Sequence, residues 1–397
     1  SMSDSRTLVR GRVYPMDRPG RVLEWMLLED GKIAATGEGD PTDDLADTAT
    51  VLDLRSRTII PVLHDCHVHF MQTGLMELDV DLSAAEGFDD VLSIVSDAAA
   101  SYDGILLRAH SFDPDLLPDG RYPTRLELDG VSPKVPVLIK RRDGHSGVVN
   151  TAAWELIGVP DDLDGVELDA SGDASGTLRE EAYTFTVRKS ESILTREDRI
   201  ECFRRAAALA ARRGIGVVHS LTGSKVSGDR DVEILLELQD ELPVETVIYA
   251  QMEDVDRVSA LGLPRIGGCL LLDGSFSSGT AALAQPYADR EGTGVLYYED
   301  EHLTAFFRRA HAGGLQISVH ALGERAIDQA IRCYREACGG EAGDARHRIE
   351  HCELPSDEHV NAIAEMGIHP CVQPTFEFLW GGPGGMIEKR LGTERAN

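Results

Sequence analysis

The stretch that most constrains this chain is residues 58–70, where an apolar run rich in β-branched residues ends in His67 and His69. Residues at positions i and i+2 of a β-strand point to the same face of a sheet, so the two imidazoles can converge on one point. Imidazole is a common ligand for zinc, iron and manganese. The stretch therefore predicts a buried strand that ends in part of a metal site.

Charge and cysteine content exclude several classes of protein. The 397 residues carry a formal net charge of −29, whereas nucleic-acid binders present a basic surface. No apolar run is long enough to span a membrane. Seven cysteines without a disulfide pattern fit a reducing cytoplasm. We therefore expect a cytoplasmic protein that acts on a small molecule, with no nucleic-acid or membrane partner. Whether it forms a homo-oligomer is left open.

Residues 1–57 are predicted to form part of a small β-domain. Alternating segments at 7–14 and 22–28 are followed by Asp30-Gly31, a strong two-residue hairpin signal, and by further strands at 32–35 and 51–54. These strands do not make a complete domain by themselves.

From residue 58 to residue 397 the chain alternates between buried strands and helices. Strands are expected near 58–66, 214–220, 244–250, 265–274, 316–320, 347–351 and 368–373, and helices near 196–213, 230–241, 300–313, 324–338 and 356–366. Repeated units of this kind form a parallel sheet covered by helices. Seven strands that end near polar residues predict an α/β fold, a TIM-like (β/α)8 barrel with its chemistry at the strand C-termini.

A long insertion is expected at about 75–200, between the first and second barrel strands. It contains two apolar runs, at 105–110 and 135–139, and a hairpin signal around 168–178. An insertion at the catalytic end of a barrel usually shapes a substrate pocket.

Four histidines stand at the ends of three predicted strands: His67, His69, His320 and His351. A single histidine would more simply be a core or surface residue. Four at corresponding strand ends favour a metal site, and a catalytic site keeps one position open for the water that attacks the substrate.

The sequence motifs resemble those of the amidohydrolase superfamily, in the branch of YtcJ-like and N-substituted formamide deformylase-like metal-dependent hydrolases. The matching segments span residues 7–395 and include DCHVH at 65–69, RDGHS at 142–146 with Asn150, LDGS at 272–275, PY at 286–287, HALGERA at 320–326, RHRIEH at 346–351 and QP at 373–374. Each motif alone is weak, whereas their order and spacing together are specific.

The resemblance implies a barrel with a flanking β-sandwich that holds both termini. It assigns His67 and His69 as metal ligands from the first strand, and His320 and His351 as ligands from the fifth and sixth. His145, in the insertion, would face the substrate and help to stabilise the oxyanion. Asp143 would support it, although a plain turn explains Asp143 equally well.

The implied reaction is hydrolysis of a C–N bond, in an amide or N-substituted formamide, by attack of metal-bound hydroxide. Two alternatives stay open. The same fold could carry a mononuclear deaminase or a lactone or ester hydrolase, or the chain could be a catalytically impaired metal-binding or regulatory relative.

Two departures from the family pattern bear on the metal site. The position of a metal-bridging lysine in many relatives falls on Cys269, which is either a thiolate ligand or a small buried side chain. We expect one firmly bound divalent metal, zinc before iron or manganese, and leave a second open. No aspartate follows Asp357, so the eighth-strand aspartate that serves relatives as a base is expected to lie beyond a chain cut short, or to come from another chain.

Overall fold

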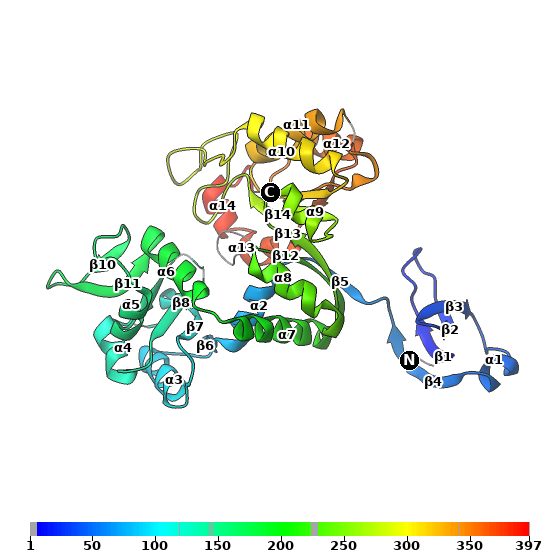
Figure 1. Ribbon diagram of the computed structural model, residues 1–397, viewed down its shortest axis with the longest axis horizontal. Coiled ribbons are helices and arrows are strands. Elements are labelled where there is room, and N and C mark those ends of the chain that lie inside the picture. The colour runs from blue at the N-terminus through cyan, green and yellow to red at the C-terminus, as the bar shows by residue number, and fades with distance from the viewer. Residues whose placement is uncertain are drawn as a thin grey trace. The chain divides into compact units, whose positions relative to one another are not determined.

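A computed structural model describes residues 6–118, 120–142, 144, 146–223, 229–340 and 342–396. The chain divides into two compact units (Figure 1). One is Ser1–His64 with Gly214–Gly216, and the other is Asp65–Arg213 with Val217–Asn397. No helix within the described ranges is long and apolar enough to cross a membrane.

The first unit contains a four-stranded sheet in the order β3-β2-β1-β4. Its elements are β1 (Thr7–Val13), β2 (Leu23–Glu29), β3 (Lys32–Gly37), α1 (Asp43–Asp47) and β4 (Thr50–Ile59). The predicted hairpin is confirmed, because β2 and β3 pair from Glu29 and Lys32 and the turn residues Asp30 and Gly31 both have positive φ. Among the described residues this unit has one sheet, so the second layer of a β-sandwich remains an expectation.

The second unit holds the predicted parallel sheet. Seven strands follow the order β17-β16-β15-β14-β13-β12-β5 and form a nearly closed barrel. They are β5 (Leu63–Val68), β12 (Ile215–Thr222), β13 (Glu245–Ala250), β14 (Arg265–Leu271), β15 (Gln316–Ala321), β16 (Arg348–His351) and β17 (His369–Cys371). Six of the seven predicted strands are confirmed with small shifts, whereas the first is divided: Thr58 and Ile59 belong to β4, residues 60–62 lie in no strand, and β5 begins at Leu63. The described residues contain no eighth strand of this sheet.

Helices follow most of these strands, as the sequence predicts. They are α2 (Phe70–Leu78), α7 (Arg196–Arg212), α8 (Arg230–Leu238), α9 (Val255–Ala260), α10 (Asp300–Ala312), α11 (Glu324–Cys338), α12 (Asp357–Met366), α13 (Pro374–Trp380) and α14 (Met386–Leu391). Reciprocal capping fixes the start of two of them: Thr195 and Asp198 cap α7, and Ser356 and His359 cap α12.

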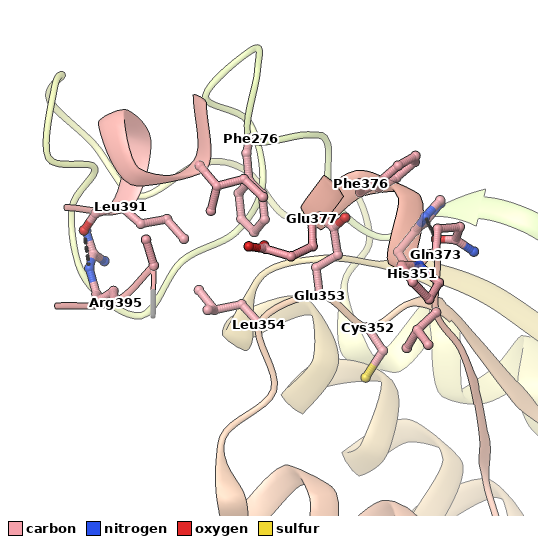
Figure 2. A pocket seen from close by; sticks show the side chains of 14 residues that line it. Phe276, His351, Cys352, Glu353, Leu354, Gln373, Phe376, Glu377, Leu391 and Arg395 are labelled. Atoms are coloured by element: carbon pink, nitrogen blue, oxygen red, sulfur yellow. Dashed lines mark hydrogen bonds between the residues drawn. The ribbon is translucent and has the colours of Figure 1, made fainter. Parts of the chain in front are cut away.

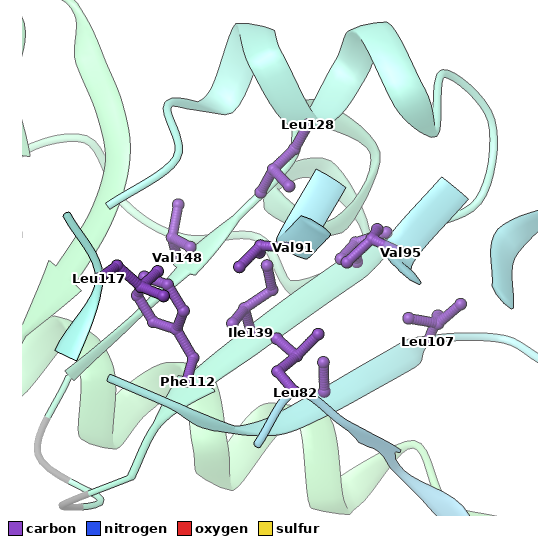
Figure 3. Packing of buried hydrophobic residues seen from close by; sticks show 11 residues of the cluster. Leu82, Val91, Val95, Leu107, Phe112, Leu117, Leu128, Ile139 and Val148 are labelled. Carbon is purple, nitrogen blue, oxygen red and sulfur yellow. The ribbon is translucent and has the colours of Figure 1, made fainter. Parts of the chain in front are cut away.

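The insertion folds around a sheet of its own. Its strands β6 (Val80–Asp81), β7 (Leu107–Phe112), β8 (Val137–Arg141), β9 (Ser146–Val149), β10 (Val166–Leu168) and β11 (Ala174–Arg179) lie in the order β10-β11-β9-β8-β7-β6. The helices α3 (Phe88–Ala100), α4 (Arg125–Val131), α5 (Thr151–Ile157) and α6 (Glu180–Ser192) belong to the same segment. Buried residues such as Val91, Leu128 and Ile139 form an apolar core between sheet and helices (Figure 3). The two apolar runs and the hairpin are thus confirmed as strands of one sheet.

His347, buried directly before β16, forms a hydrogen-bonded pair with His311 of α10. The backbone N–H of Ile317 donates to Nδ1 of His347 at 3.0 Å, so neutral His347 carries its proton on Nε2 and donates to Nδ1 of His311, also at 3.0 Å. Although Cys338 lies close enough to complete a possible metal-binding group, this tautomer leaves Nε2 of His347 without a lone pair for a metal. Burial lowers the pKa of His347 to about 4.

We expect this pair to make the protein sensitive to acid. The unfolded chain protonates His347 near pH 6.5 and the folded chain only near pH 4, so its contribution is complete above pH 6.5 and is lost as pH falls to 4. The loss should reach up to about 3 kcal/mol. In His347→Asn the amide oxygen replaces the acceptor without titrating, and urea unfolding of both proteins between pH 4 and 7.5 checks the difference. Parallel pH profiles would contradict this assignment.

Candidate metal centre

Cys269 lies at the centre of the histidine cluster. It is 3% exposed, and its Sγ is 3.7 Å from Nδ1 of His320 and 3.8 Å from Nε2 of His351. His67 joins Cys269 and His351 in a group whose ligand atoms all lie within 4.8 Å of one another. The ring centroid of His351 is 4.7 Å from that of His67 and 4.6 Å from that of His320.

Two glycines place Cys269 at this point of β14. Gly267 and Gly268 both have positive φ, at 92° and 58°, and the pairing of β14 with β15 is irregular between Ile266 and Leu270. A Cβ at position 267 would lie 2.2 Å from the carbonyl oxygen of Ser318. Only glycine tolerates both this backbone and this approach, and the resulting bulge directs the thiol toward the histidines.

In each of three imidazoles, one ring nitrogen is bound to a hydrogen-bond acceptor outside the cluster. Nδ1 of His67 lies 2.6 Å from Oε2 of Glu350, Nε2 of His320 lies 3.0 Å from the carbonyl oxygen of Gly274, and Nδ1 of His351 lies 2.6 Å from Oε1 of Gln373. Metal-binding histidines almost always donate their second ring nitrogen to such an acceptor, which leaves the other nitrogen free for the ion.

The charges of the cluster are also those of a cation site. Burial of Cys269 would raise the pKa of its thiol, but hydrogen bonds from His320, His351, His67 and His69 hold that pKa well below its usual value. Burial lowers the pKa of His67, and its bonds to Cys269, Cys371 and Glu350 outweigh this and raise it to about 11. Without an ion, the Cys269 thiolate would therefore face a protonated His67 at neutral pH, and a bound divalent cation would replace that proton as the partner of the thiolate.

The distances from Cys269 to two of the histidines fit ligands of one metal ion. With Zn–S near 2.3 Å and Zn–N near 2.0–2.1 Å, sulfur and nitrogen ligands of one zinc ion lie roughly 3.5 Å apart, close to the two observed S···N distances of 3.7 and 3.8 Å. Thiolate and imidazole together favour zinc over harder cations.

Glu350 orients the ring of His67, and both of its carboxylate oxygens have further partners. This buried carboxylate lies 2.7 Å from Nε of Arg348 and also accepts from Ser318. Arg348 in turn donates to the carbonyl oxygen of Cys66 at 2.7 Å and its guanidinium lies 4.6 Å from the centroid of the Tyr249 ring. Since both oxygens of Glu350 have partners, the nearby group of His67, Glu350 and Cys371 is better explained as support for His67 than as a second metal site.

His69 lies differently from the sequence expectation. Strand β5 ends at Val68, and His69 is the residue that precedes α2, so the two histidines do not both lie on the strand. Its ring centroid is nevertheless 5.4 Å from that of His67, and it contributes to lowering the pKa of Cys269. The turn into α2 thus keeps His69 beside the cluster.

The structure brings together His67, His69, Cys269, His320 and His351. The two predicted catalytic residues, Asp143 and His145, lie outside the described residues and stay predictions. Sequence reasoning missed Glu350 and Gln373 as supports of the rings. Their motifs, RHRIEH and QP, were the available signal.

Asp273 contacts both His320 of the cluster and the backbone of the loop that follows β14. It is fully buried and accepts from the backbone N–H groups of Ala282, Leu322 and Gly323 at 2.8–3.0 Å. Its carboxylate also lies 3.4 Å from Nε2 of His320. The loop and the end of β15 are thereby fixed around one carboxylate.

A cavity of about 350 Å³ adjoins the cluster and shares His351 and Gln373 with it (Figure 2). Burial raises the pKa of Glu353, which also lines the cavity, to about 7; the charge of His320 opposes this shift, and the charges of Asp273 and Glu377 add to it.

Comparison with known proteins agrees with this geometry. The model of the amidohydrolase family matches residues 50–397. The chain belongs to the amidohydrolase family. It is a metal-dependent hydrolase of this type, and its barrel, with histidines at the strand ends, is what the resemblance predicts.

Individual relatives of this amidohydrolase are distant but extensive. It is 26% identical to the putative amidohydrolase YtcJ of Bacillus subtilis (strain 168), over 97% of this chain and 75% of that protein. It is 24% identical to the N-substituted formamide deformylase of Arthrobacter pascens, over 94% and 73%. The crystal structure of an uncharacterized metal-dependent hydrolase from Pyrococcus horikoshii superposes with a TM-score of 0.81 at 25% identity, covering 98% of this chain and 78% of that one.

Proposed function

We propose that this amidohydrolase cleaves a C–N bond, in an amide or N-substituted formamide, with one divalent metal ion, zinc, held by His67, His69, Cys269, His320 and His351. The observation that carries the proposal is the set of three imidazoles around Cys269 whose outer nitrogens are each bound to an acceptor. The similarity to a named formamide deformylase supports the choice of bond.

When bound, such an ion activates water as a nucleophile and polarises a carbonyl oxygen. The chain's own residues prepare the site for this chemistry. Glu350 holds His67, and Gln373 holds His351, each with one nitrogen toward Cys269. Preorganised ligands of this kind lose little freedom when the ion binds. His145 and Asp143 are proposed, on sequence grounds alone, to face the substrate and its oxyanion.

The substrate class is tested with a small panel. The zinc-loaded full chain is assayed on N-benzylformamide, an N-acetyl amino acid, a γ-lactone and an aminated heterocycle. We expect turnover of the formamide or the amide, loss of turnover after chelation, and recovery when zinc is restored. Faster turnover of the lactone or the heterocycle would overturn the choice of bond, and turnover by the metal-free chain would overturn the role of the metal.

A further inference from the structure

The cavity next to the metal centre is lined by both apolar and acidic side chains. Its lining is largely apolar, with Phe276, Leu354, Phe376 and Leu391 among the side chains, yet Glu353 and Glu377 also line it. Figure 2 shows these two glutamates among the aromatic and aliphatic side chains. The two carboxylates therefore belong to the lining of one cavity.

Among the residues that the structure describes, neither carboxylate forms an ion pair or accepts a hydrogen bond, although the positive charge of His320 acts on Glu353. The one arginine of the cavity lining, Arg395, donates instead to the carbonyl oxygens of Leu391, Gln285 and Pro286. Two carboxylates that line one cavity attract a positive charge more strongly than either does alone.

We infer that this cavity binds a ligand with an ammonium group on an apolar body, the ammonium between Glu353 and Glu377 and the apolar part against Phe276 and Phe376. The aromatic rings suit both halves of such a ligand, because their edges pack with hydrocarbon and their faces attract cations. A bare divalent cation fits less well, since calcium and magnesium need about six oxygen ligands and the apolar walls supply none.

The inference deepens the proposed function and rests on it for the role of the ligand. Because His351 and Gln373 belong both to the cavity and to the metal cluster, a molecule in the cavity lies beside the reaction centre. The ammonium group would then belong to the substrate or to the amine that hydrolysis of an amide releases.

Binding of benzylammonium and of its neutral counterpart benzyl alcohol, each measured by calorimetry at pH 7 on the full chain, tests the cavity without any need for turnover. We expect benzylammonium to bind at least about tenfold more tightly. Glu353→Gln should remove most of this preference and Glu377→Gln part of it. Glu365→Gln, on the exposed face of α12, is the matched control and should keep it.

Thermal melting of each variant checks that it is folded, and Glu377→Gln, at an exposed position, keeps the test valid if Glu353→Gln is unstable. Equal affinity for the two probes, or a preference that survives both substitutions, would overturn the inference even in an active hydrolase. A clear preference in a chain that hydrolyses no amide would instead retain the site and reject the proposed reaction.

Faster hydrolysis of N-(4-aminomethylbenzyl)formamide than of N-(4-methylbenzyl)formamide assigns the ammonium to the substrate. Equal rates of hydrolysis, with inhibition by benzylammonium, assign it to the product.

Discussion

His320→Ala is expected to empty the metal site and to reduce hydrolysis by more than a hundredfold. His320 is 7% exposed, its Nδ1 lies 3.7 Å from the sulfur of Cys269, and its Nε2 is occupied by the carbonyl oxygen of Gly274. Loss of a partner behind a metal ligand alone typically costs roughly 10–100-fold in metal affinity or activity, so loss of a ligand should cost more. Metal content after dialysis and kcat/KM on the best substrate of the panel measure both effects.

His302→Ala is the matched control for His320→Ala. His302 lies on the exposed side of α10, where it bonds Glu253 at 2.7 Å. We expect this variant to keep its metal and its activity within about twofold, because an exposed ion pair of this kind contributes roughly 1 kcal/mol or less. Full metal content and activity in His320→Ala would exclude this histidine from the site.

Glu350→Gln should have the largest effect on stability. The substitution neutralises a fully buried carboxylate and leaves the Arg348 guanidinium, 5% exposed, without its counter-charge. Removal of one partner from a buried ion pair typically costs about 3–5 kcal/mol. Urea unfolding of the metal-free proteins measures this cost separately from any change in metal binding.

The same variant should also weaken metal binding by roughly 10–100-fold, because His67 loses the acceptor that orients its ring. A titration with zinc and a competing chelator measures the affinity. Glu365→Gln on α12 provides the control at an exposed glutamate. An unchanged zinc affinity in a folded Glu350→Gln protein would show that Glu350 supports only Arg348.

The barrel and its ligand positions could be predicted because they depend on local patterns. Buried runs that end in histidine place His320 and His351 at the ends of neighbouring strands, and parallel strands bring their ends together. The role of Cys269 could not be settled in this way. It depends on the backbone at Gly267 and Gly268 and on distances to rings more than 50 residues away in the chain.

The role of Glu350 in orienting His67 could not be predicted from the sequence either. Glu350 and His351 are adjacent in one strand, yet one holds the ring of His67 and the other faces Cys269. Only the packed barrel shows that Arg348 and Ser318 occupy the remaining positions around Glu350. The insertion likewise gave recognisable strands, whereas the order of its sheet depends on long-range pairing that no local pattern specifies.

The central claim is that one metal ion binds among His67, His69, Cys269, His320 and His351. Anomalous diffraction from crystals of the zinc-loaded full chain, recorded on both sides of the zinc absorption edge, tests it most directly. We predict a single strong peak at about 2.3 Å from Sγ of Cys269 and about 2.0–2.1 Å from Nδ1 of His320 and Nε2 of His351. A peak among His311, Cys338 and His347 instead, or no peak beside Cys269, would contradict the account.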